Sequence, residues 1–532
     1  MQMLRGLSVI GFETGAEQQE KLFAFSTILG KPLPEAFSVA SKEEINQALL
    51  LAEAAFPVFS ALPGTRRAEF LEAIAENIAA LGDDLIQRAH LESGLPLPRL
   101  SGERDRTVNQ LKLFAAVLRE GSWVEAVIDT ALPDRQPLPR ADLRKMLVPL
   151  GPVAVFAASN FPFAFSTAGG DTAAALASGC PVILKAHSSH LGTNELIAGA
   201  IQKAAIATGM PEGVFSALNG EGAALGQQLA RHASIKAIGF TGSYRAGMSL
   251  FRTASNDRAT PIPVYAEMSS INPVMLLPET LKQNGTAIAK QLAGSITLGV
   301  GQFCTNPGLI LLLKDETSQQ FITALTAALE AVPPATMLNK GICAAYYQAK
   351  KKTGSIAGVK ILIEKPDEGD AFKGSAALLQ VDAADFIKQP ELQEEIFGPA
   401  SLVILCDDHS AMEAALASLH GQLTGSLYGT DGDLQEFAPA MALLSSKVGR
   451  LIYNNVPTGV EVCHAMVHGG PFPATTDGRS TSVGADAIKR FVRPVCLQDC
   501  PATLLPAALQ DSNPLNIMRK LNGQYTRESP AK

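Results

Sequence analysis

One cysteine in this sequence stands in a setting that suits nucleophilic chemistry. Cys304 lies in the stretch Gly301-Gln302-Phe303-Cys304-Thr305-Asn306-Pro307-Gly308, after residues 287–300, whose small side chains favour a helix. Glycine and proline on both sides favour a turn, which would lift the side chain toward a cleft. A reactive cysteine needs such a partly exposed position that favours the thiolate. An inert cysteine at a helix end fits this octamer equally well, because most unpaired cysteines behave as small apolar residues.

Two polar residues follow apolar strands and could assist a nucleophile. Glu267 comes directly after the apolar segment 263–266. Partial loss of water there would raise the pKa of its carboxyl toward the range of a general base. Asn160 precedes Phe161 and Pro162, and a rigid amide at this place could donate to a developing oxyanion. Each residue also has an ordinary explanation, as an exposed strand-end glutamate or as an asparagine that forms a turn before proline.

A second set of residues suits a phosphorylated ligand. The turn Gly239-Phe240-Thr241-Gly242-Ser243 follows a predicted strand and opens a predicted helix. Glycine lets the backbone approach a phosphate, and a helix N-terminus attracts an anion. Lys185 ends another strand beside Ala186-His187-Ser188-Ser189-His190, where polar groups are well placed to touch a nucleotide. Each signal is weak alone, since packing glycines and solvated loops look the same. His187 and His190 are a weak metal pair, and no metal site is predicted.

Residues 151–267 contain the elements that would hold these side chains. Strands alternate with helices, which predicts parallel β–α–β units and a doubly wound sheet. Such sheets bind ligands beyond the carboxyl ends of their strands. The predicted strands are 153–157, 181–185, 213–218, 235–240 and 263–266, and the predicted helices are 165–178, 191–208, 222–231 and 244–253.

The rest of the chain predicts a helical beginning, an arm and a second α/β unit. Ser41 and Glu44 form a capping box that starts the first of four helices, the last of which ends near residue 118. Strands at 124–130 and 143–150, joined by a proline-rich turn, predict a protruding hairpin suited to oligomerisation. Later elements are strands at 273–277, 309–313, 360–363, 400–405, 424–428 and 490–500, helices at 317–331 and 409–419, and a proline-rich tail at 501–532.

The composition excludes several classes of protein. With 532 residues the chain exceeds one core, so two or three domains are expected. A net charge of −7 argues against non-specific binding to nucleic acid or to a membrane surface. No apolar run approaches a membrane span and the first 15 residues lack a signal pattern, so a cytoplasmic location is expected. Seven scattered cysteines without a CxxC pair indicate reduced thiols.

Taken together and in order, these stretches resemble the aldehyde dehydrogenase superfamily. The resemblance rests on GPVAVFAASNFP (151–162), VILKAHSSH (182–190), GFTGS (239–243), AEMSSINP (266–273), GQFCTNPG (301–308) and EEIFGP (394–399). It implies an α/β fold in which a Rossmann-like, doubly wound cofactor domain spans residues 1–121 and 150–267. It also implies an α/β catalytic domain at 268–485 and a β-hairpin oligomerisation arm at 122–149 and 486–500, with 501–532 as a C-terminal tail. The implied assembly is a homodimer or homotetramer that acts on a small aldehyde.

The resemblance also implies a catalytic role for three residues. Cys304 matches the nucleophile, Glu267 the general base and Asn160 the oxyanion donor. The implied reaction oxidises an aldehyde to a carboxylic acid through a cysteine thiohemiacetal and a thioester, which water then hydrolyses. One departure is the run Glu267-Met268-Ser269-Ser270-Ile271, where the family usually has glutamate, leucine, two glycines and lysine. The glutamate is retained, and only the local packing is expected to differ.

The cofactor residues follow from the same resemblance. Ser188 stands where NAD-preferring members usually carry a glutamate that binds the ribose hydroxyls. Its small neutral side chain leaves room for a 2′-phosphate, with nearby cations as partners. We therefore predict NADP as the cofactor and leave acceptance of NAD open. The residues matched to cofactor contacts are Lys185 and Ser188 on the adenosine side, Gly242 and Ser243 at the pyrophosphate, and Glu395 with Phe397 at the nicotinamide ribose.

A narrower resemblance, over nearly the whole chain, is to NADP-dependent α-ketoglutaric semialdehyde (2,5-dioxovalerate) dehydrogenases. It rests on GQFCTNPG, KAHSSH, residues 468–477 and the tail from Asn513 to Arg527. Since an acidic substrate needs a cation, we predict that Arg106 anchors its distal carboxylate. A surface arginine paired with Glu103 or Asp105 is an equally good interpretation of Arg106. The predicted walls of the substrate tunnel are Phe161, Phe165 and Phe303.

Other functions remain open at this stage. One is NADP-dependent oxidation of apolar or general aldehydes. Another is a CoA-acylating enzyme, against which the retained Glu267 argues because it favours hydrolysis of the thioester. A third, of another class, is a catalytically silent structural or binding protein of this fold. The joint presence of Cys304, Glu267 and Asn160 argues against it.

Overall fold

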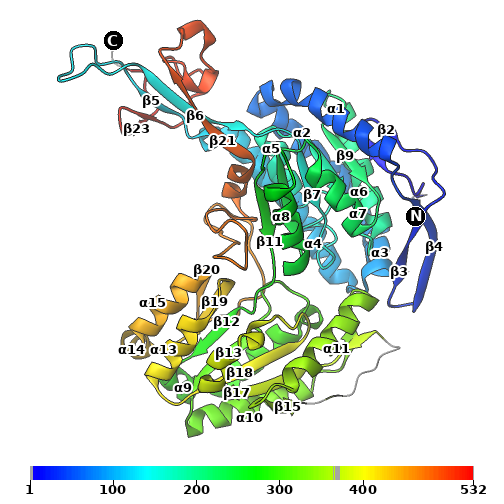
Figure 1. Cartoon of the computed structure of the whole chain (residues 1–532), viewed down its shortest axis with the longest axis vertical. Helices are drawn as coiled ribbons and strands as arrows, with labels where there is room; N and C mark the ends of the chain where they lie inside the picture. Colours follow the sequence, from blue (N-terminus) through cyan, green and yellow to red (C-terminus); the bar gives the residue numbers. More distant parts are fainter. Residues whose placement is uncertain (1–3, 364, 366–371, 531–532) are drawn as a thin grey trace.

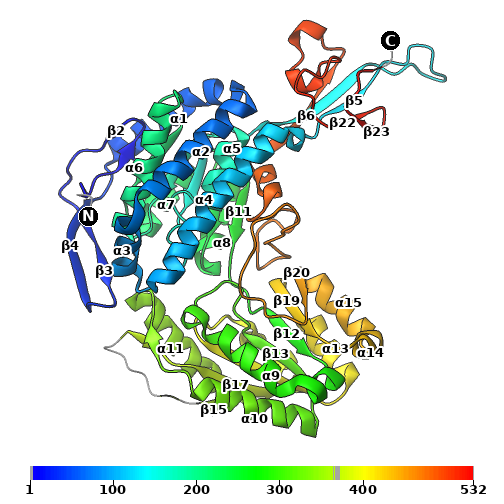
Figure 2. The ribbon, with the colours of Figure 1, turned by 180° about the vertical axis from the view of Figure 1, so that it is seen from behind.

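The structure, a computed structural model, describes residues 4–363, 365 and 372–530. Figures 1 and 2 show two α/β units, one above the other, and an arm that projects from the upper unit close to the C-terminus. None of the helices in these residues is long and apolar enough to cross a membrane.

The upper unit is built on a seven-stranded sheet in the order β11-β10-β7-β8-β9-β1-β2. From β7, the chain adds β8 and β9 on one side and β10 and β11 on the other, all parallel. The strand order therefore reverses between β7 and β10, which opens a crevice beyond the ends of these two strands. The predicted doubly wound sheet is confirmed. Its strands are β1 (Val9–Ile10), β2 (Glu13–Thr14), β7 (Val153–Phe156), β8 (Val182–Lys185), β9 (Phe215–Leu218), β10 (Ala237–Thr241) and β11 (Val264–Glu267).

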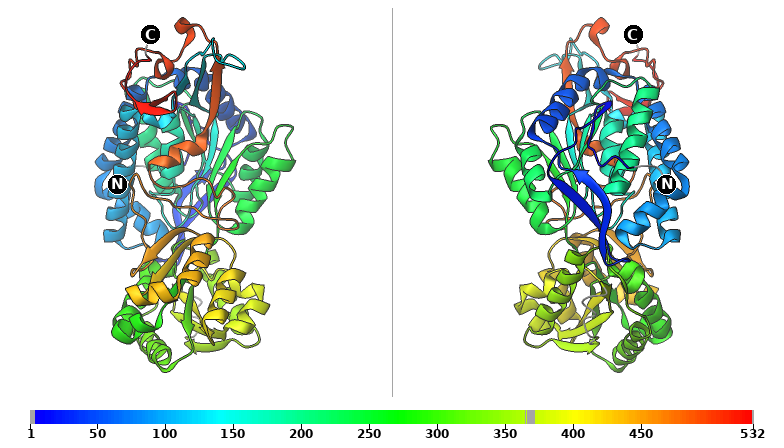
Figure 3. Two further views of the ribbon diagram at one scale, coloured as in Figure 1. Left: turned by 90° about the vertical axis from the view of Figure 1, so that its left-hand side faces the viewer. Right: turned by 90° about the vertical axis from the view of Figure 1, so that its right-hand side faces the viewer.

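Helices cover both faces of this sheet, as the edge-on views of Figure 3 show. Val153 and Val155 of β7 belong to one buried core with α2 to α6, whereas Ala154 and Phe156 belong to a second core with α1, α7 and α8. A parallel strand buried on both faces is apolar throughout, and this one is. The helices are α1 (Lys42–Ala61), α2 (Gly64–Ala80), α3 (Gly82–Ser93), α4 (Leu97–Glu120), α5 (Gly170–Ser178), α6 (Leu191–Ala207), α7 (Gly222–Arg231) and α8 (Tyr244–Asn256).

The N-terminal helices begin where the sequence indicates. The capping box at α1 is present, with the Glu44 amide donating to the Ser41 hydroxyl at 3.2 Å and the Ser41 amide donating to the Glu44 carboxylate at 2.8 Å. Some predicted boundaries were wrong, among them that of the helix predicted at 287–300, which spans Pro278–Thr297. The helix predicted from Phe165 begins only at Gly170, because the buried Glu103 of α4 accepts hydrogen bonds from the amides of Phe163 and Ala164 and holds this stretch as a loop.

The lower unit has a second seven-stranded sheet, in the order β15-β17-β18-β13-β12-β19-β20. Its predicted strands are present as β12 (Pro273–Leu276), β13 (Leu309–Leu313), β15 (Lys360–Ile363), β18 (Ala400–Cys406) and β19 (Gln422–Tyr428). The sequence analysis missed β17 (Ala377–Asp382), β20 (Val448–Tyr453) and α11 (Lys340–Gly354). The edge strand β20 is half-exposed along most of its length and interrupted by glycine and arginine, so it lacks an apolar pattern. The other helices are α9 (Pro278–Thr297), α10 (Glu316–Glu330), α12 (Ala383–Lys388), α13 (His409–Ser418), α14 (Asp431–Glu436) and α15 (Ala438–Lys447).

The arm is a five-stranded sheet, and residues after 500 are part of it. Its order is β21-β6-β5-β22-β23, made of β5 (Val127–Asp129), β6 (Leu143–Pro149), β21 (Val492–Gln498), β22 (Arg519–Leu521) and β23 (Gln524–Thr526). The prediction of a tail was wrong in this respect. Leu505, Leu509 and Ile517 pack with Ile128 in a small buried cluster. Burial of apolar side chains therefore holds this segment, although its many prolines had led to the prediction of a tail. Near the N-terminus, β3 (Lys21–Ser26) and β4 (Lys31–Ser38) form a separate hairpin.

One segment of the second half of the chain returns to the first sheet. The Met268 amide donates to the Ala474 carbonyl at 2.8 Å, and the Thr476 amide donates to the Ala266 carbonyl at 3.1 Å. The stretch around residue 475 thus lies against β11, where Glu267 ends the strand. This contact brings residues 467–483 to the junction of the two units.

We expect Leu509→Ala to lower the free energy of unfolding by about 2–5 kcal/mol, because it leaves a cavity in the arm cluster. Leu509 is 0% exposed, whereas Leu504 in the same segment is 71% exposed. Leu504→Ala is therefore the matched control, with an expected change below about 0.5 kcal/mol. Denaturant unfolding followed by circular dichroism measures both variants. Equal effects of the two substitutions would contradict the described packing of this segment.

Candidate active site

Cys304 stands at a sharp turn between α9 and β13. The chain leaves α9 through the turn Leu298–Gly301, in which Gly299, Val300 and Gly301 have positive φ angles of 56°, 58° and 65°. A side chain at Gly301 would place its Cβ 2.2 Å from the Gly398 carbonyl oxygen, so only glycine fits this close approach. Cys304 is half-exposed at the tip of the turn, while its neighbours on both sides are buried. The cysteine is thus raised out of the core, as its flanking residues predict.

A buried asparagine fixes the backbone on both sides of the cysteine. The amide of Asn272 donates to the carbonyl of Cys304 at 2.8 Å and to the carbonyl of Asn306 at 2.9 Å. Its Oδ1 accepts from the hydroxyls of Ser270 and Thr424. Ser270 belongs to the departure noted in the sequence, and here its hydroxyl joins this buried network. The loop is held without the glycine pair that the family usually has.

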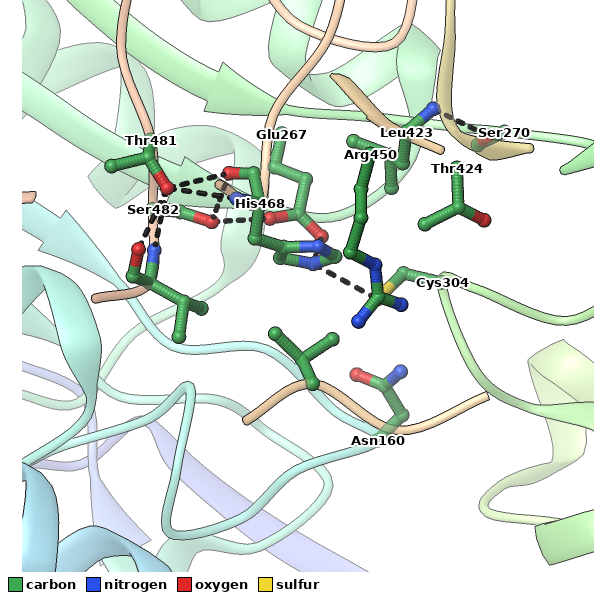
Figure 4. A network of polar contacts seen from close by, with 12 residues as sticks. Asn160, Glu267, Ser270, Cys304, Leu423, Thr424, Arg450, His468, Thr481 and Ser482 are labelled. Carbon is green, nitrogen blue, oxygen red and sulfur yellow. Dashed lines mark hydrogen bonds and ion pairs between the residues drawn. The ribbon is translucent and has the colours of Figure 1, made fainter. Parts of the chain in front are cut away.

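Glu267 and His468 lie beside the sulfur of Cys304. Nε2 of His468 is 3.4 Å from Cys304 Sγ and 2.9 Å from Glu267 Oε1, and Ser482 Oγ donates to Glu267 Oε2 at 2.7 Å (Figure 4). A carboxylate oxygen of Glu267, Sγ of Cys304 and a ring nitrogen of His468 all lie within 4.8 Å of one another. Nδ1 of His468 is buried without a partner among the described residues. We therefore assign the ring proton to Nε2, which donates to Glu267.

The electrostatics of this cluster differ from the expectation for Glu267. Burial opposes its ionisation, but the electrostatic interaction with His468 and the hydrogen bonds of His468, Ser482 and Cys304 outweigh burial and hold its pKa below the usual value. The expected rise of the Glu267 pKa was therefore wrong, because three donors converge on the carboxylate. Burial and the neighbouring charge of Glu267 raise the pKa of the Cys304 thiol well above its usual value. The resting pair is an ionised glutamate beside a protonated thiol.

Asn160 approaches Cys304 from the upper unit. It follows β7 at the switch point, and its Nδ2 donates to the Gln302 carbonyl at 3.1 Å. Figure 4 shows its side-chain amide close to Cys304, below it in this view. Arg99 of α4 donates to the Asn160 carbonyl at 2.7 Å, which holds the residue from behind. The structure therefore brings together the three residues predicted to be catalytic.

The adenosine-side residues gather at the carboxyl ends of β8 and β10. Lys185 is buried, and within the described part of the chain its ammonium has no carboxylate partner. Burial lowers its pKa to about 8. Ser188 is exposed on the following turn. Exposed Ser243 caps α8, its hydroxyl accepting from the Ala246 amide, and Gly242 stands just before it. An uncompensated cation near a helix N-terminus fits the phosphate groups of a dinucleotide.

Glu395 and Phe397 line a pocket beside the cysteine loop. The pocket is also lined by Ser270, Gly301 and Asn306, which adjoin Cys304. Burial raises the pKa of Glu395 to about 7, against the hydrogen bonds that it accepts from the Ser269 side chain and the Ser270 amide. The two residues therefore lie at a pocket that shares lining residues with the cysteine loop.

A sequence model described as "Aldehyde dehydrogenase family" matches residues 33–491. This chain belongs to the aldehyde dehydrogenase family. Among its relatives, alpha-ketoglutaric semialdehyde dehydrogenase 2 of Azospirillum brasilense is 51% identical over 98% of this chain and 99% of its own length. The alpha-ketoglutaric semialdehyde dehydrogenase of Acinetobacter baylyi is 47% identical over 93% of this chain and 94% of its own length.

Solved structures share the fold at low identity. The 1-pyrroline-5-carboxylate dehydrogenase of Thermus thermophilus matches with a TM-score of 0.78 at 20% identity, covering 92% of each chain. Betaine aldehyde dehydrogenase of Staphylococcus aureus matches with a TM-score of 0.78 at 18% identity, covering 94% of this chain and 96% of its own. These likenesses confirm the predicted aldehyde dehydrogenase fold. As a member of this family, the enzyme oxidises an aldehyde with NAD or NADP.

The predicted substrate residues of this dehydrogenase form one aromatic group near the cysteine. The rings of Phe165 and Phe303 each lie 5.3 Å from the ring of Phe161, and Phe165 is 6.1 Å from the His468 ring. The guanidinium of Arg106 lies 5.4 Å above the Phe165 ring. Arg106 is half-buried and forms no ion pair with Glu103 or Asp105 in the described part of the chain, although the charge of buried Glu103 acts on it.

Three residues of the site were missed by the sequence analysis. His468 and Ser482 are separated from Glu267 by about two hundred residues, and the contact of residues 467–483 with β11 brings them to it. The stretch 468–477 had been noted as part of a resemblance, but no local pattern marked His468 as a partner of the glutamate. Arg450 comes from the unpredicted edge strand β20, and Figure 4 shows its guanidinium directed at Cys304.

We expect Glu267→Gln to shift the pH profile of Cys304 alkylation to lower pH. The substitution removes the negative charge that raises the pKa of the thiol, so the thiolate forms at lower pH. Iodoacetamide labelling rates of the cofactor-free enzyme between about pH 6 and 10, with the labelled residue located by mass spectrometry, measure this shift. Glu330→Gln, at the exposed end of α10, serves as the control. A profile that stayed in place or moved to higher pH would contradict the assigned charge of Glu267.

Proposed function

We propose that this aldehyde dehydrogenase oxidises α-ketoglutaric semialdehyde to α-ketoglutarate with NADP. The proposal rests first on two relatives of that name, at 51% and 47% identity over nearly the full length of each chain. The position of Arg106 supports it, because a cation beside the aromatic group gives an acidic substrate a counter-charge that an apolar aldehyde does not need.

In the proposed first step, Cys304 attacks the aldehyde carbon. Glu267, already ionised and in hydrogen-bond contact with the thiol, takes its proton as Sγ bonds to the carbon. The carbonyl oxygen becomes an oxyanion, which the Asn160 amide and the Cys304 backbone N–H stabilise. The product of this step is a thiohemiacetal on Cys304. When bound, NADP would supply the hydride acceptor for oxidation of the thiohemiacetal to a thioester.

Before the proposed second step, Glu267 releases the thiol proton to solvent. It then takes a proton from water, whose oxygen attacks the thioester carbon as the C–S bond breaks, and it passes that proton to the departing Cys304 thiolate. The acid leaves and the Cys304 thiol is restored. His468 and Ser482 donate to different oxygens of the Glu267 carboxylate, so both hold it in one orientation through the cycle. This hydrolytic step is why the site favours release of a free acid over transfer of the acyl group to CoA.

The preference for NADP follows from charge at the end of β8. Lys185 has no carboxylate partner among the described residues, and a 2′-phosphate would supply one negative group beside it. His187 stacks on His190 with ring centres 5.3 Å apart. Burial lowers the pKa of both rings, so they offer neutral polar atoms there. Ser188 leaves the adjoining surface open and uncharged.

We expect Ser188→Glu to lower the ratio of kcat/KM with NADP to kcat/KM with NAD by about 10-fold or more. The new carboxylate repels a 2′-phosphate and can accept hydrogen bonds from ribose hydroxyls, and like charges in contact cost several kcal/mol. Initial rates at varied concentrations of each cofactor give the ratio. Ser188→Gln, of the same size without the charge, should retain most of the preference. A ratio unchanged by glutamate would mean that the 2′-phosphate binds elsewhere.

The arm supports a homo-oligomer, a dimer or a tetramer, as a further part of this proposal. It carries exposed apolar side chains that a partner subunit could cover, among them Leu138 at 69% and Tyr525 at 76% exposure. A cytoplasmic location stays a prediction, and the seven free cysteines are consistent with a reducing compartment.

The proposed function is tested by the substrate profile of the wild-type enzyme. We expect kcat/KM with NADP to be at least about 10-fold higher for α-ketoglutaric semialdehyde than for succinic semialdehyde or hexanal, since one added charge contact is worth that factor. Formation of NADPH is followed at 340 nm. A lead for hexanal would overturn the proposed substrate and favour apolar aldehydes, for which the phenylalanine walls would also be suited.

A further inference from the structure

A second arginine, on the edge strand β20, faces the nucleophile. Arg450 is half-buried, and its guanidinium is directed at Cys304 (Figure 4). Nη1 donates to the Gly459 carbonyl at 3.0 Å and Nη2 to the Pro457 carbonyl at 2.8 Å, whereas Nε is buried without a partner. No carboxylate of the described residues pairs with this guanidinium.

Arg106 reaches the same loop from the other unit of the enzyme. Its Nε and Nη2 lie 3.4 Å from the Val460 carbonyl, and its Nη1 is buried without a partner. Arg106 stands on α4 of the upper unit and Arg450 on β20 of the lower one. The two guanidinium groups therefore converge on residues 457–460, beside the aromatic group that adjoins Cys304.

Two half-buried guanidinium groups with no carboxylate at ion-pair distance among the described residues are costly unless a ligand completes them. An arginine placed only to brace a loop is usually paired with a carboxylate when it is removed from water. The charges of buried Glu103 and exposed Glu461 act on Arg106, but within the described part of the chain neither carboxylate forms an ion pair with Arg106 or Arg450. Backbone carbonyls use part of each guanidinium, and the remaining N–H groups are free for an anion. Arginine also matches the planar shape of a carboxylate in a way that lysine does not.

We propose that Arg450 and Arg106 together form the receptor for the 2-oxo carboxylate end of the substrate. This inference rests on the proposed function and adds its specificity-determining residue, Arg450. The substrate's carboxylate is separated from its aldehyde carbon by a short unbranched chain, so it lies near the nucleophile when the aldehyde is bound. Its planar 2-oxo carboxylate presents three oxygens, which suits two guanidinium groups better than one. Arg450 thus selects α-keto semialdehydes over aldehydes that lack this end.

The test compares Arg450→Met and Arg106→Met with the wild-type enzyme. We expect each substitution to lower the ratio of kcat/KM for α-ketoglutaric semialdehyde to kcat/KM for hexanal by about 10-fold or more, chiefly through KM. We also expect α-ketoglutarate to inhibit hexanal oxidation by the wild-type enzyme, in competition with hexanal. Its inhibition constant should be about 10-fold higher for Arg450→Met. Lys447→Met is the matched control, because it removes one positive charge three residues away whose ammonium binds the Ala417 carbonyl.

The possible outcomes separate this inference from the proposed function. If Arg450→Met slows both aldehydes equally and leaves inhibition by α-ketoglutarate unchanged, the arginine only braces the loop and the inference is overturned. The same conclusion follows if the ratio of kcat/KM for α-ketoglutaric semialdehyde to kcat/KM for hexanal is equal in Arg450→Met and Lys447→Met. A wild-type enzyme that prefers hexanal would overturn the proposed substrate, while loss of α-ketoglutarate inhibition in Arg450→Met would still support the receptor.

Discussion

The active site depends on the hydrogen bonds that converge on the carboxylate of Glu267. This glutamate is 1% exposed and ends the last parallel strand of the first sheet, where an unpaired charge would be costly. His468 and Ser482 form hydrogen bonds with this carboxylate, and both belong to a segment that follows the second unit in the chain. The same contacts that make the charge tolerable therefore hold the two units together at the nucleophile.

The raised pKa of the cysteine is a consequence of the same arrangement. A thiol beside a buried carboxylate stays protonated until the carboxylate takes its proton, so the nucleophile forms only when an electrophile is in place. The backbone around Cys304 is correspondingly rigid, with Asn272 bonded to carbonyls on both sides of it. Rigidity of this kind keeps the sulfur near Asn160 and Glu267 without a cost at the moment of reaction.

Cations without a carboxylate at ion-pair distance among the described residues mark the places where anionic ligands are expected. Lys185 lies at the end of β8, and Arg106 and Arg450 both donate to carbonyls of residues 457–460. In each case the fold leaves donors near the site unpaired, at a cost in stability that a bound anion would offset. The cation at the end of β8 and the two cations at residues 457–460 accord with one anionic cofactor and one anionic substrate.

The sequence by itself determined the doubly wound sheet, the capped first helix, the family and the candidate catalytic residues Cys304, Glu267 and Asn160. Those features follow from local sequence patterns, namely apolar strands, turn residues and motifs that each span a few positions. Only the tertiary structure decided the partners of Glu267, the role of residues after 500 and the position of Arg450. His468, Ser482 and Arg450 reach the site through contacts between residues far apart in the chain, and β20 carries no apolar pattern. The pKa of Glu267 also changed direction for this reason, because burial alone could be inferred from the strand, whereas the three donors that reverse its effect come from elsewhere in the fold.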